Sequence, residues 1–419
     1  MSSTTKEVCV AFVSGIAVSI SAYYLYRSFS ISPSSDISLT DAEGIESTIG
    51  NTPLFVIKSL SEATGCTILA KAEFLNGAGG SPKDRVALSI INKAEKRGLL
   101  SPFSGDTVYE GTVGSTGISL ATICRARGYL AHICMPDDIA MEKSDLLLKL
   151  GAVVDRVKPA PIVDRAHFVN RARILAEEHT ASTTKRGRGF FANQFETAAN
   201  WEAHFETTGP EIYEQCDGRI DAFVAGAGTG GTISGVALYL KAKMSNNGKA
   251  ALAEPQVVLA DPQGSGLYNK IKHGVMFNTK EREGTRRRDQ VDTVVEGIGL
   301  TRLTANFEVG RELIDDAVKV TDDQARAMAR WLVEKDGIFI GSSSAVNCMS
   351  CVLLMSHTLT LKGVAAVQTA RRLGTGHRIV TILCDSGLKH LSKFWAQVGE
   401  VGGDAGRDDL ADVLCWPSK

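Results

Sequence analysis

A lysine in a glycine-rich stretch is the residue of this chain best placed for covalent chemistry. Residues 76–85 read NGAGGSPKDR, and the glycines allow a tight loop. Ser81 is a favourable N-cap and Pro82 suits the first helical position, so we predict a helix with Lys83 in its first turn. The helix dipole disfavours a cation there, which favours the neutral amine that reacts with an aldehyde. On this stretch alone, a solvated lysine beside Asp84 is the commoner alternative.

A second glycine-rich segment is suited to bind a phosphate group. Residues 226–232 (GAGTGGT) follow the apolar segment 220–225 and precede a helical pattern. The backbone N–H groups of such a loop bind anions, helped by the helix N-terminus. The glycine spacing also matches a dinucleotide fingerprint, which requires an acidic residue about 20 positions further on. The nearest candidate, Asp261, lies 30 positions after Gly231. We therefore favour a monophosphate over a dinucleotide, and a turn without a ligand is the remaining alternative.

Two further loops of small polar residues also precede helical patterns. Residues 112–117 (TVGSTG) offer backbone amides for a carboxylate, and residues 341–344 (GSSS) offer a hydroxyl for a neutral ring nitrogen. Taken singly, each is more typical of a capped helix start. Together with the amine of Lys83 and the phosphate loop, they describe a site for pyridoxal phosphate.

Alternating strand and helix patterns position these four loops. Strands are predicted at residues 54–57, 67–74, 106–110, 129–134, 152–157, 220–225, 256–260 and 379–384. Helices are predicted from residue 83 to a stop at Gly98, at 115–127, 139–150, 163–179 and 231–243, within 317–336, and at 344–360. This alternation indicates an α/β fold with mostly parallel sheets.

The composition excludes several classes of function. The chain has 419 residues, long enough for two or three domains, and a net charge of −1, which gives no basis for a nucleic-acid partner. Nine scattered cysteines indicate a reducing compartment rather than a disulfide framework. Cys348 and Cys351 form one CxxC pair without a second pair, so we predict no metal site.

The N-terminal segment has the features of a membrane anchor. Residues 8–26, from Val8 to Tyr26, carry no charge, and as a helix they would span about 28 Å, close to the thickness of the hydrocarbon core. Tyrosines and Arg27 at its C-terminal end are typical of an interfacial anchor. A cleaved signal peptide is the alternative, but its basic region and cleavage site are poorly defined. We predict a retained anchor, followed by a polar linker, with most of the chain on the cytosolic side.

The order of the motifs resembles the cysteine synthase and cystathionine β-synthase family of fold-type II pyridoxal phosphate enzymes. The resemblance is closest to fungal members with an N-terminal membrane segment that are assigned to mitochondria. It extends from TIGNTPL at residues 48–54 to about Phe394. Between these ends lie SPKDR at 81–85, NQF at 193–195, the segment 201–210, the loop 226–232, EGIG at 296–299 and CDSG at 384–387.

The resemblance implies a tryptophan synthase β-like fold, in which two doubly wound α/β domains hold the cofactor between them. The larger domain would comprise residues 44–75 and 195–398, and the smaller one residues 76–194. Residues 1–43 would be the transmembrane helix and linker, and residues 399–419 a tail. The resemblance further implies a homodimer at the mitochondrial outer membrane, with the catalytic part in the cytosol.

The resemblance also assigns roles to individual residues. Lys83 matches the lysine that binds the cofactor aldehyde as a Schiff base and then acts as the catalytic base. Ser343 matches the serine facing the pyridine nitrogen, although the run of three serines leaves the register open by one residue. The phosphate loop matches at Gly228, Thr229, Gly230, Gly231 and Thr232. Substrate-binding positions match at Thr112, Gly114, Thr116, Gln194 and Gly297.

Two positions depart from the family pattern TSGNTG in the loop 112–117. Val113 replaces a serine, and Ser115 replaces an asparagine that contacts the phenolic oxygen of the cofactor. Ser115 is shorter and would reach this oxygen through a water molecule. The activity implied is a β-replacement that makes cysteine from O-acetylserine and sulfide. The altered loop leaves three alternatives open: cystathionine β-synthase-like condensation, serine or threonine dehydration, and a weakly active membrane-tethered relative that binds or senses.

Overall fold

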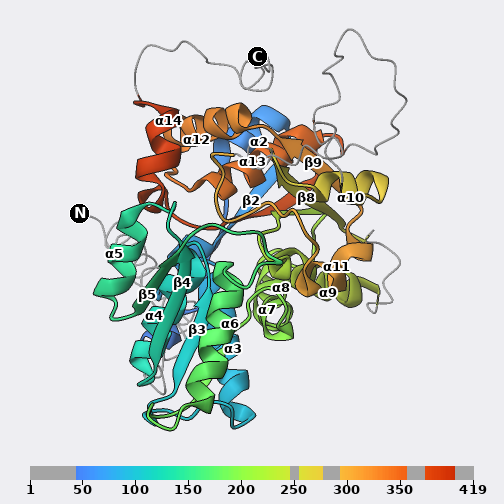
Figure 1. Ribbon diagram of the computed structural model, residues 1–419. Helices are drawn as coiled ribbons and strands as arrows, with labels where there is room; N and C mark the ends of the chain where they lie inside the picture. The colour runs from blue at the N-terminus through green and yellow to red at the C-terminus, as the bar shows by residue number, and fades with distance from the viewer. Residues whose placement is uncertain (1–43, 246–253, 277–292, 356–372, 402–419) are drawn as a thin grey trace, which may run out of the picture. The chain divides into compact units, whose positions relative to one another are not determined.

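The computed structural model describes residues 44–245, 254–276, 293–355 and 373–401, which contain two separate β-sheets (Figure 1). In the six-stranded sheet, the first strand is antiparallel to its neighbour and the remaining pairs are parallel. Its spatial order is β1 (Leu54–Val56), β2 (Thr67–Ala72), β10 (Arg378–Leu383), β7 (Ala222–Gly226), β8 (Gln256–Pro262) and β9 (Asp316–Val320).

Helices cover both faces of this sheet because its central strands are apolar along their whole length. In β7, Ala222 and Val224 pack in the core formed with α12 (Asp322–Asp336) and α13 (Ser342–Met355). The alternate residues Phe223 and Ala225 pack on the other side, against α9 (Gly231–Ser245). The shorter helices of this region are α2 (Lys58–Thr64), α7 (Ala198–Ala203), α8 (Gly209–Gln215), α10 (Leu267–His273), α11 (Ala305–Gly310) and α14 (Ala396–Val398).

The four-stranded sheet is entirely parallel, in the order β5 (Val153–Val157), β4 (Leu130–Pro136), β3 (Thr107–Gly111) and β6 (Gly189–Phe191). One face packs against α3 (Lys83–Lys96) and α4 (Ser115–Ala126). The opposite face packs against α6 (Phe168–Ala181), which lies along β3 and β4 in Figure 1. A shorter helix, α5 (Met141–Lys149), connects β4 to β5.

The predicted α/β class with mostly parallel sheets is confirmed, with several local corrections. The strand predicted at 67–74 ends at Ala72, where a 3₁₀ turn, Glu73–Leu75, begins. The helix predicted from residue 163 begins at Phe168, because the Asn170 amide bonds two carbonyls of the preceding turn. The strands β6 and β9 and the helices α7 and α8 were not predicted. They are short, and short elements carry a weak periodic signal. The domain boundaries given above stay a prediction.

The predicted membrane anchor and its linker precede the described residues, and most of the predicted tail follows them. The same holds for the end of the helix predicted at 344–360, beyond Met355. Within the ranges that the structure describes, we find no helix that is both long and apolar enough to cross a membrane.

Candidate active site

Two of the predicted binding loops follow the carboxyl ends of parallel strands, where ligands bind in open α/β sheets. The loop 112–117 follows β3, and the loop 226–232 begins at the last residue of β7. The family motif at residues 384–387 follows β10. The serine run at 341–344 does not follow a strand of either sheet. It follows α12, and an isolated bridge between Ile340 and Ser386 joins it to the segment after β10.

Lys83 is the first residue of α3 and is partly buried. The prediction of Ser81 as N-cap is wrong by one residue: Pro82 occupies that position, and the Ser81 hydroxyl accepts from the Lys83 N–H at 3.3 Å. Burial lowers the pKa of the Lys83 ammonium, although nearby acidic groups, among them the Cys384 thiol, act in the opposite direction. The lowered pKa supports the predicted neutral amine. The main cause of the lowered pKa is desolvation and not, as the sequence suggested, the helix dipole. The alternative of a solvated lysine is wrong.

Asp84 is also not the solvated carboxylate of that alternative. It is fully buried, and its carboxylate accepts hydrogen bonds from the backbone of Gly79 and Gly80 at 2.8 and 2.9 Å. The Ser119 hydroxyl of α4 donates to the same carboxylate and to the Ser115 carbonyl. Asp84 thereby joins the loop before Lys83 to the helix that follows the loop 112–117.

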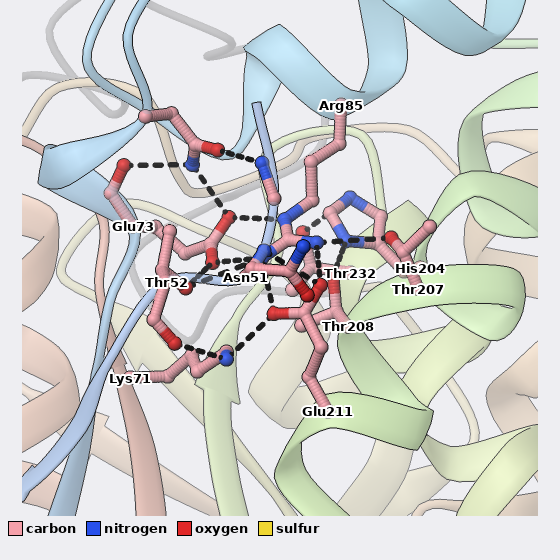
Figure 2. A network of polar contacts seen from close by, with 12 residues as sticks. Asn51, Thr52, Lys71, Glu73, Arg85, His204, Thr207, Thr208, Glu211 and Thr232 are labelled. Carbon is pink, nitrogen blue, oxygen red and sulfur yellow. Dashed lines mark hydrogen bonds and ion pairs between the residues drawn. The ribbon is translucent and has the colours of Figure 1, made fainter. Parts of the chain in front are cut away.

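Arg85 fixes the first turn of α3 through a buried ionic network, which Figure 2 shows. Its guanidinium donates to both oxygens of Glu73 at 2.8 Å and to both oxygens of Glu211 at 2.6 and 2.8 Å. Lys71 of β2 adds a second cation, 2.6 Å from Glu211. Burial opposes the charged form of Glu211, but Arg85 and Lys71 outweigh it and hold the pKa of this carboxyl at about 2. Paired charges of this kind fix the first turn of α3, which begins at Lys83.

The loop 226–232 has the backbone geometry of an anion cup. Gly230 has a φ of +89°, a conformation that favours glycine. A Cβ atom at Gly228 would lie 2.0 Å from the Gly297 carbonyl oxygen, so the cup and the segment around Gly297 are in direct backbone contact. Helix α9 begins at Gly231, which adds its N-terminal amides to the cup.

Two buried side chains that sequence reasoning missed support the cup. The side-chain NH₂ group of Asn200, in α7, donates to the Thr229 hydroxyl at 2.9 Å. The side-chain oxygen of Asn200, Oδ1, is buried without a hydrogen-bond partner. His204 lies with Nε2 3.1 Å from the Thr232 hydroxyl and Nδ1 3.0 Å from Thr208 (Figure 2). Burial, reinforced by the Arg85 and Lys83 cations, lowers the pKa of His204 well below its usual value. The neutral ring of His204 orients the Thr232 hydroxyl. The spacing of the two residues in the sequence does not predict this contact, because it forms only in the folded structure.

The structure distinguishes the three serines at the start of α13. The Ser342 hydroxyl accepts from the Glu296 N–H at 2.9 Å, and the Ser344 hydroxyl accepts from the Cys384 N–H at 2.8 Å. Ser343 instead hydrogen-bonds the Cys384 thiol, which is close enough to Lys83 to affect its pKa. These contacts favour Ser343, and not its neighbours, as the serine facing the site.

The loop 112–117 and Gln194 come together as predicted for a carboxylate site. The Thr116 hydroxyl donates to Gln194 Oε1 at 2.5 Å, and Gln194 Nε2 reaches the Gly111 carbonyl at 3.4 Å. The Thr112 hydroxyl accepts from the Gly114 N–H at 3.4 Å. Ser115 begins α4, and Val113 is 39% exposed, so the residue that replaces the family serine lies partly in solvent.

The dinucleotide alternative for the loop 226–232 depends on Asp261 as its acidic residue, and the structure gives this residue other partners. Asp261 is buried, forms an ion pair with Lys319 at 3.2 Å and accepts from the Tyr268 N–H at 2.8 Å. A carboxylate with these partners is not available to bind ribose hydroxyls.

A charged cluster joins α5 to the segment that contains Gly297. The Glu296 carboxylate lies 2.7 Å from Lys143 Nζ of α5 and 3.3 Å from His390 Nδ1. The other ring nitrogen of His390 lies 3.0 Å from Asp385. Burial disfavours the charged ring, but the two carboxylates outweigh it and raise the pKa of His390 to about 9. Burial likewise opposes the ionised form of Glu296, but His390 and Lys143 lower its pKa to about 2.

This cluster predicts a dependence of stability on pH. The folded pKa of His390 is above its ordinary value of 6.5, so its contribution is complete below about pH 6.5 and is lost as pH rises to about 9. The contribution of Glu296 is complete above its ordinary pKa of 4.5 and is lost only towards pH 2. In urea titrations between pH 6.5 and 9, we expect the unfolding free energy of the wild type to fall by about 2–3 kcal/mol more than that of His390→Gln. The exposed His273 provides the control: His273→Gln should keep the wild-type slope. Equal slopes for wild type and His390→Gln would contradict the assignment.

The groups described here are a lysine amine of lowered pKa, a glycine cup with helix N-terminal amides, and the Ser343 hydroxyl, which like the lysine interacts with Cys384. They fit pyridoxal phosphate: Lys83 would hold its aldehyde, the cup its phosphate and Ser343 its ring nitrogen. The cup is a cradle that a single Cβ at Gly228 would obstruct. The fold and the site thus define a pyridoxal-phosphate-dependent enzyme.

Comparison with known proteins agrees with this class. Residues 45–385 match the family model described as pyridoxal-phosphate dependent enzyme, so the chain belongs to that family and binds pyridoxal phosphate. It is 68% identical over 381 residues to a protein of Emericella nidulans named cysteine synthase 2, covering 89% of this chain and 83% of that protein. It is 48% identical to a Saccharomyces cerevisiae protein named "Putative mitochondrial cysteine synthase", covering 97% and 96% of the two chains. Among solved structures, an O-ureido-L-serine synthase aligns with a TM-score of 0.67 and 28% identity, covering 87% of this chain and 97% of that one.

Proposed function

We propose that this chain makes L-cysteine from O-acetyl-L-serine and sulfide by β-replacement. The observation that carries the proposal is the partly buried Lys83 at the start of α3, whose pKa is lowered by burial and which interacts with the Cys384 thiol. The high identity to proteins named cysteine synthase supports cysteine as the product.

Each group of the site has a definite part in this reaction. Pyridoxal phosphate, when bound, supplies an electron-poor ring that stabilises negative charge at the substrate α-carbon. The neutral Nζ of Lys83 takes the α-proton and later returns it to the product. The Ser343 hydroxyl would hydrogen-bond the ring nitrogen of the bound cofactor and keep it neutral, which would favour elimination over transamination. The cup residues Gly228–Thr232 hold the phosphate, and Gly297 lies against this cup.

The substrate carboxylate is held by Thr112, Gly114, Thr116 and Gln194, with the backbone of Val113 and Ser115 completing the loop. Since Thr116 and Gln194 are already hydrogen-bonded, this part of the site is preorganised. Ser115 is shorter than the asparagine of the family pattern and would contact the cofactor through a water molecule.

The proposal is tested with purified enzyme reconstituted with pyridoxal phosphate. With O-acetylserine and sulfide, we expect stoichiometric release of acetate and formation of cysteine. Serine with homocysteine, and serine or threonine alone, should turn over at least about 100-fold more slowly. Cystathionine or keto acid as the main product would replace the proposal with one of the alternative reactions. A protein that binds the cofactor but converts none of these substrates would indicate a binding or sensing role.

Thr116→Val tests the carboxylate site. The valine keeps the size but removes the hydroxyl, so Gln194 loses the 2.5 Å partner that fixes its side-chain amide in the carboxylate site. We expect the KM for O-acetylserine to rise about tenfold, equivalent to one hydrogen bond, with a smaller change in kcat. Thr122→Val is the matched control on the same helix, because the Thr122 hydroxyl bonds the backbone carbonyls of Ala78 and Ile118 and not Gln194. An unchanged KM in Thr116→Val would remove Thr116 from the substrate site.

We further propose that residues 8–26 anchor the enzyme in a mitochondrial membrane, with the catalytic part facing the cytosol. The uncharged run with its terminal tyrosines motivates this, and the name of the yeast relative supports the compartment. Full-length protein should stay in the membrane pellet after carbonate extraction of mitochondria, and a variant lacking residues 1–43 should not. Release of the full-length protein would contradict the anchor. The outer membrane and a homodimeric state are the finer expectations, to be tested by protease access in intact mitochondria and by light scattering.

A further inference from the structure

A second cluster of chemically active side chains lies on the face of the four-stranded sheet that packs against α6. His132 and Cys134 are two residues apart on β4, so they point to the same face. Asp155, on the edge strand β5, is the direct register partner of Cys134. An imidazole nitrogen, a thiol sulfur and a carboxylate oxygen thus lie within 4.8 Å of one another.

Ordinary core packing leaves one polar atom of this cluster, His132 Nε2, without a hydrogen-bond partner. The ring of His132 stacks on Tyr109 at a centroid distance of 4.9 Å, but its Nε2 atom is buried without a hydrogen-bond partner. A buried polar atom without a partner is costly and calls for an explanation. One carboxylate oxygen of Asp155 forms an ion pair with Arg171 of α6 at 3.2 Å. The second carboxylate oxygen takes no part in that ion pair.

We propose that His132, Cys134 and Asp155 form a binding site for a divalent transition metal ion of the zinc type, separate from the cofactor site. Mixed nitrogen, sulfur and oxygen donors are a typical zinc set, and a three-ligand site leaves a fourth position for water. The edge position of β5 gives access, since the Asp155 side chain is 30% exposed, whereas Cys134 is fully buried.

Binding requires small and definite changes. Zinc–ligand distances of about 2.0–2.3 Å would draw the three donor atoms closer together than they now lie. Burial raises the pKa of the Cys134 thiol to about 12, so the ion must displace the thiol proton, and affinity should increase with pH. Burial lowers the pKa of His132, so its ring is neutral and offers a lone pair. A bound ion would also connect β4 to β5 beneath α6 and raise the melting temperature.

The test uses the full-length holoenzyme after removal of metals with a chelator. We expect calorimetry with zinc chloride to give one site per chain, and Co²⁺ to give the long-wavelength ligand-field absorbance of a tetrahedral site, clear of the cofactor bands. Cys134→Ser and Asp155→Asn should each weaken zinc binding at least tenfold. Cys124→Ser is the matched control, because Cys124 is a buried thiol of α4 on the opposite face of the same sheet.

Asp155→Asn keeps the size of a partly exposed side chain, so this variant decides the question even if Cys134→Ser does not fold. The proposal is overturned if the wild type binds no zinc. It is equally overturned if Asp155→Asn binds zinc as tightly as the wild type, or if the loss follows Cys124→Ser instead. The cofactor absorbance should stay constant during the titration, which separates this site from Lys83.

Discussion

Lys83→Ala is expected to lower kcat/KM for cysteine formation by at least about 10³-fold and to abolish the visible absorbance of the covalently held cofactor. The variant loses both the amine that reacts with the aldehyde and the base that moves the α-proton, and a positioned general base alone contributes 10²- to 10⁴-fold. Helix α3 should stay intact, because Asp84 and Arg85 hold its first turn independently of Lys83. Cysteine formation and absorbance spectra of the reconstituted protein provide the measurement.

Lys93 offers a matched control on the same helix. Its ammonium group pairs with Glu202 on the protein surface, so Lys93→Ala should keep the spectrum and the activity. An active, yellow Lys83→Ala enzyme would mean that another amine holds the cofactor, and the site built here would then be wrong.

Gly228→Ala should lower the affinity for pyridoxal phosphate at least about 100-fold, a loss of about 2.7 kcal/mol. The added methyl group would lie 2.0 Å from the carbonyl oxygen of Gly297, which is backbone and cannot rotate away. The cup must therefore open and withdraw its amides from the phosphate. Fluorescence titration of the apoenzyme with pyridoxal phosphate measures the effect.

Gly374→Ala is the control for the loss of a glycine as such. A Cβ atom at Gly374 meets no atom within 4 Å, and the residue lies before β10, away from the cup. This variant should bind the cofactor like the wild type. If Gly228→Ala binds equally well, the phosphate does not lie in this loop.

Much of the fold was predictable because its long buried elements leave strong local patterns. The apolar runs that became β7, β8 and β10, and the periodic helices α3, α4 and α9, were placed to within a few residues. The short strand β6 and the interrupted helices α7 and α8 were missed. Their formation depends on long-range contacts, such as the pairing of β6 with β3 and the packing of α7 on α3 and α9, which no local periodicity records.

The sequence by itself determined that Lys83 begins a helix after a flexible loop, that residues 226–232 can bind a phosphate, and that small polar residues accompany them. These are local properties of glycine, proline and hydroxyl residues, which act over one helical turn. Only the tertiary structure showed that burial lowers the pKa of the lysine, that Ser342 and Ser344 bond backbone N–H groups whereas Ser343 contacts Cys384, and that His204 supports Thr232. The proximity of Asp155 to His132 and Cys134 also became visible only in the tertiary structure. Desolvation and contacts between distant segments arise when the chain packs, so no spacing along the sequence carries them.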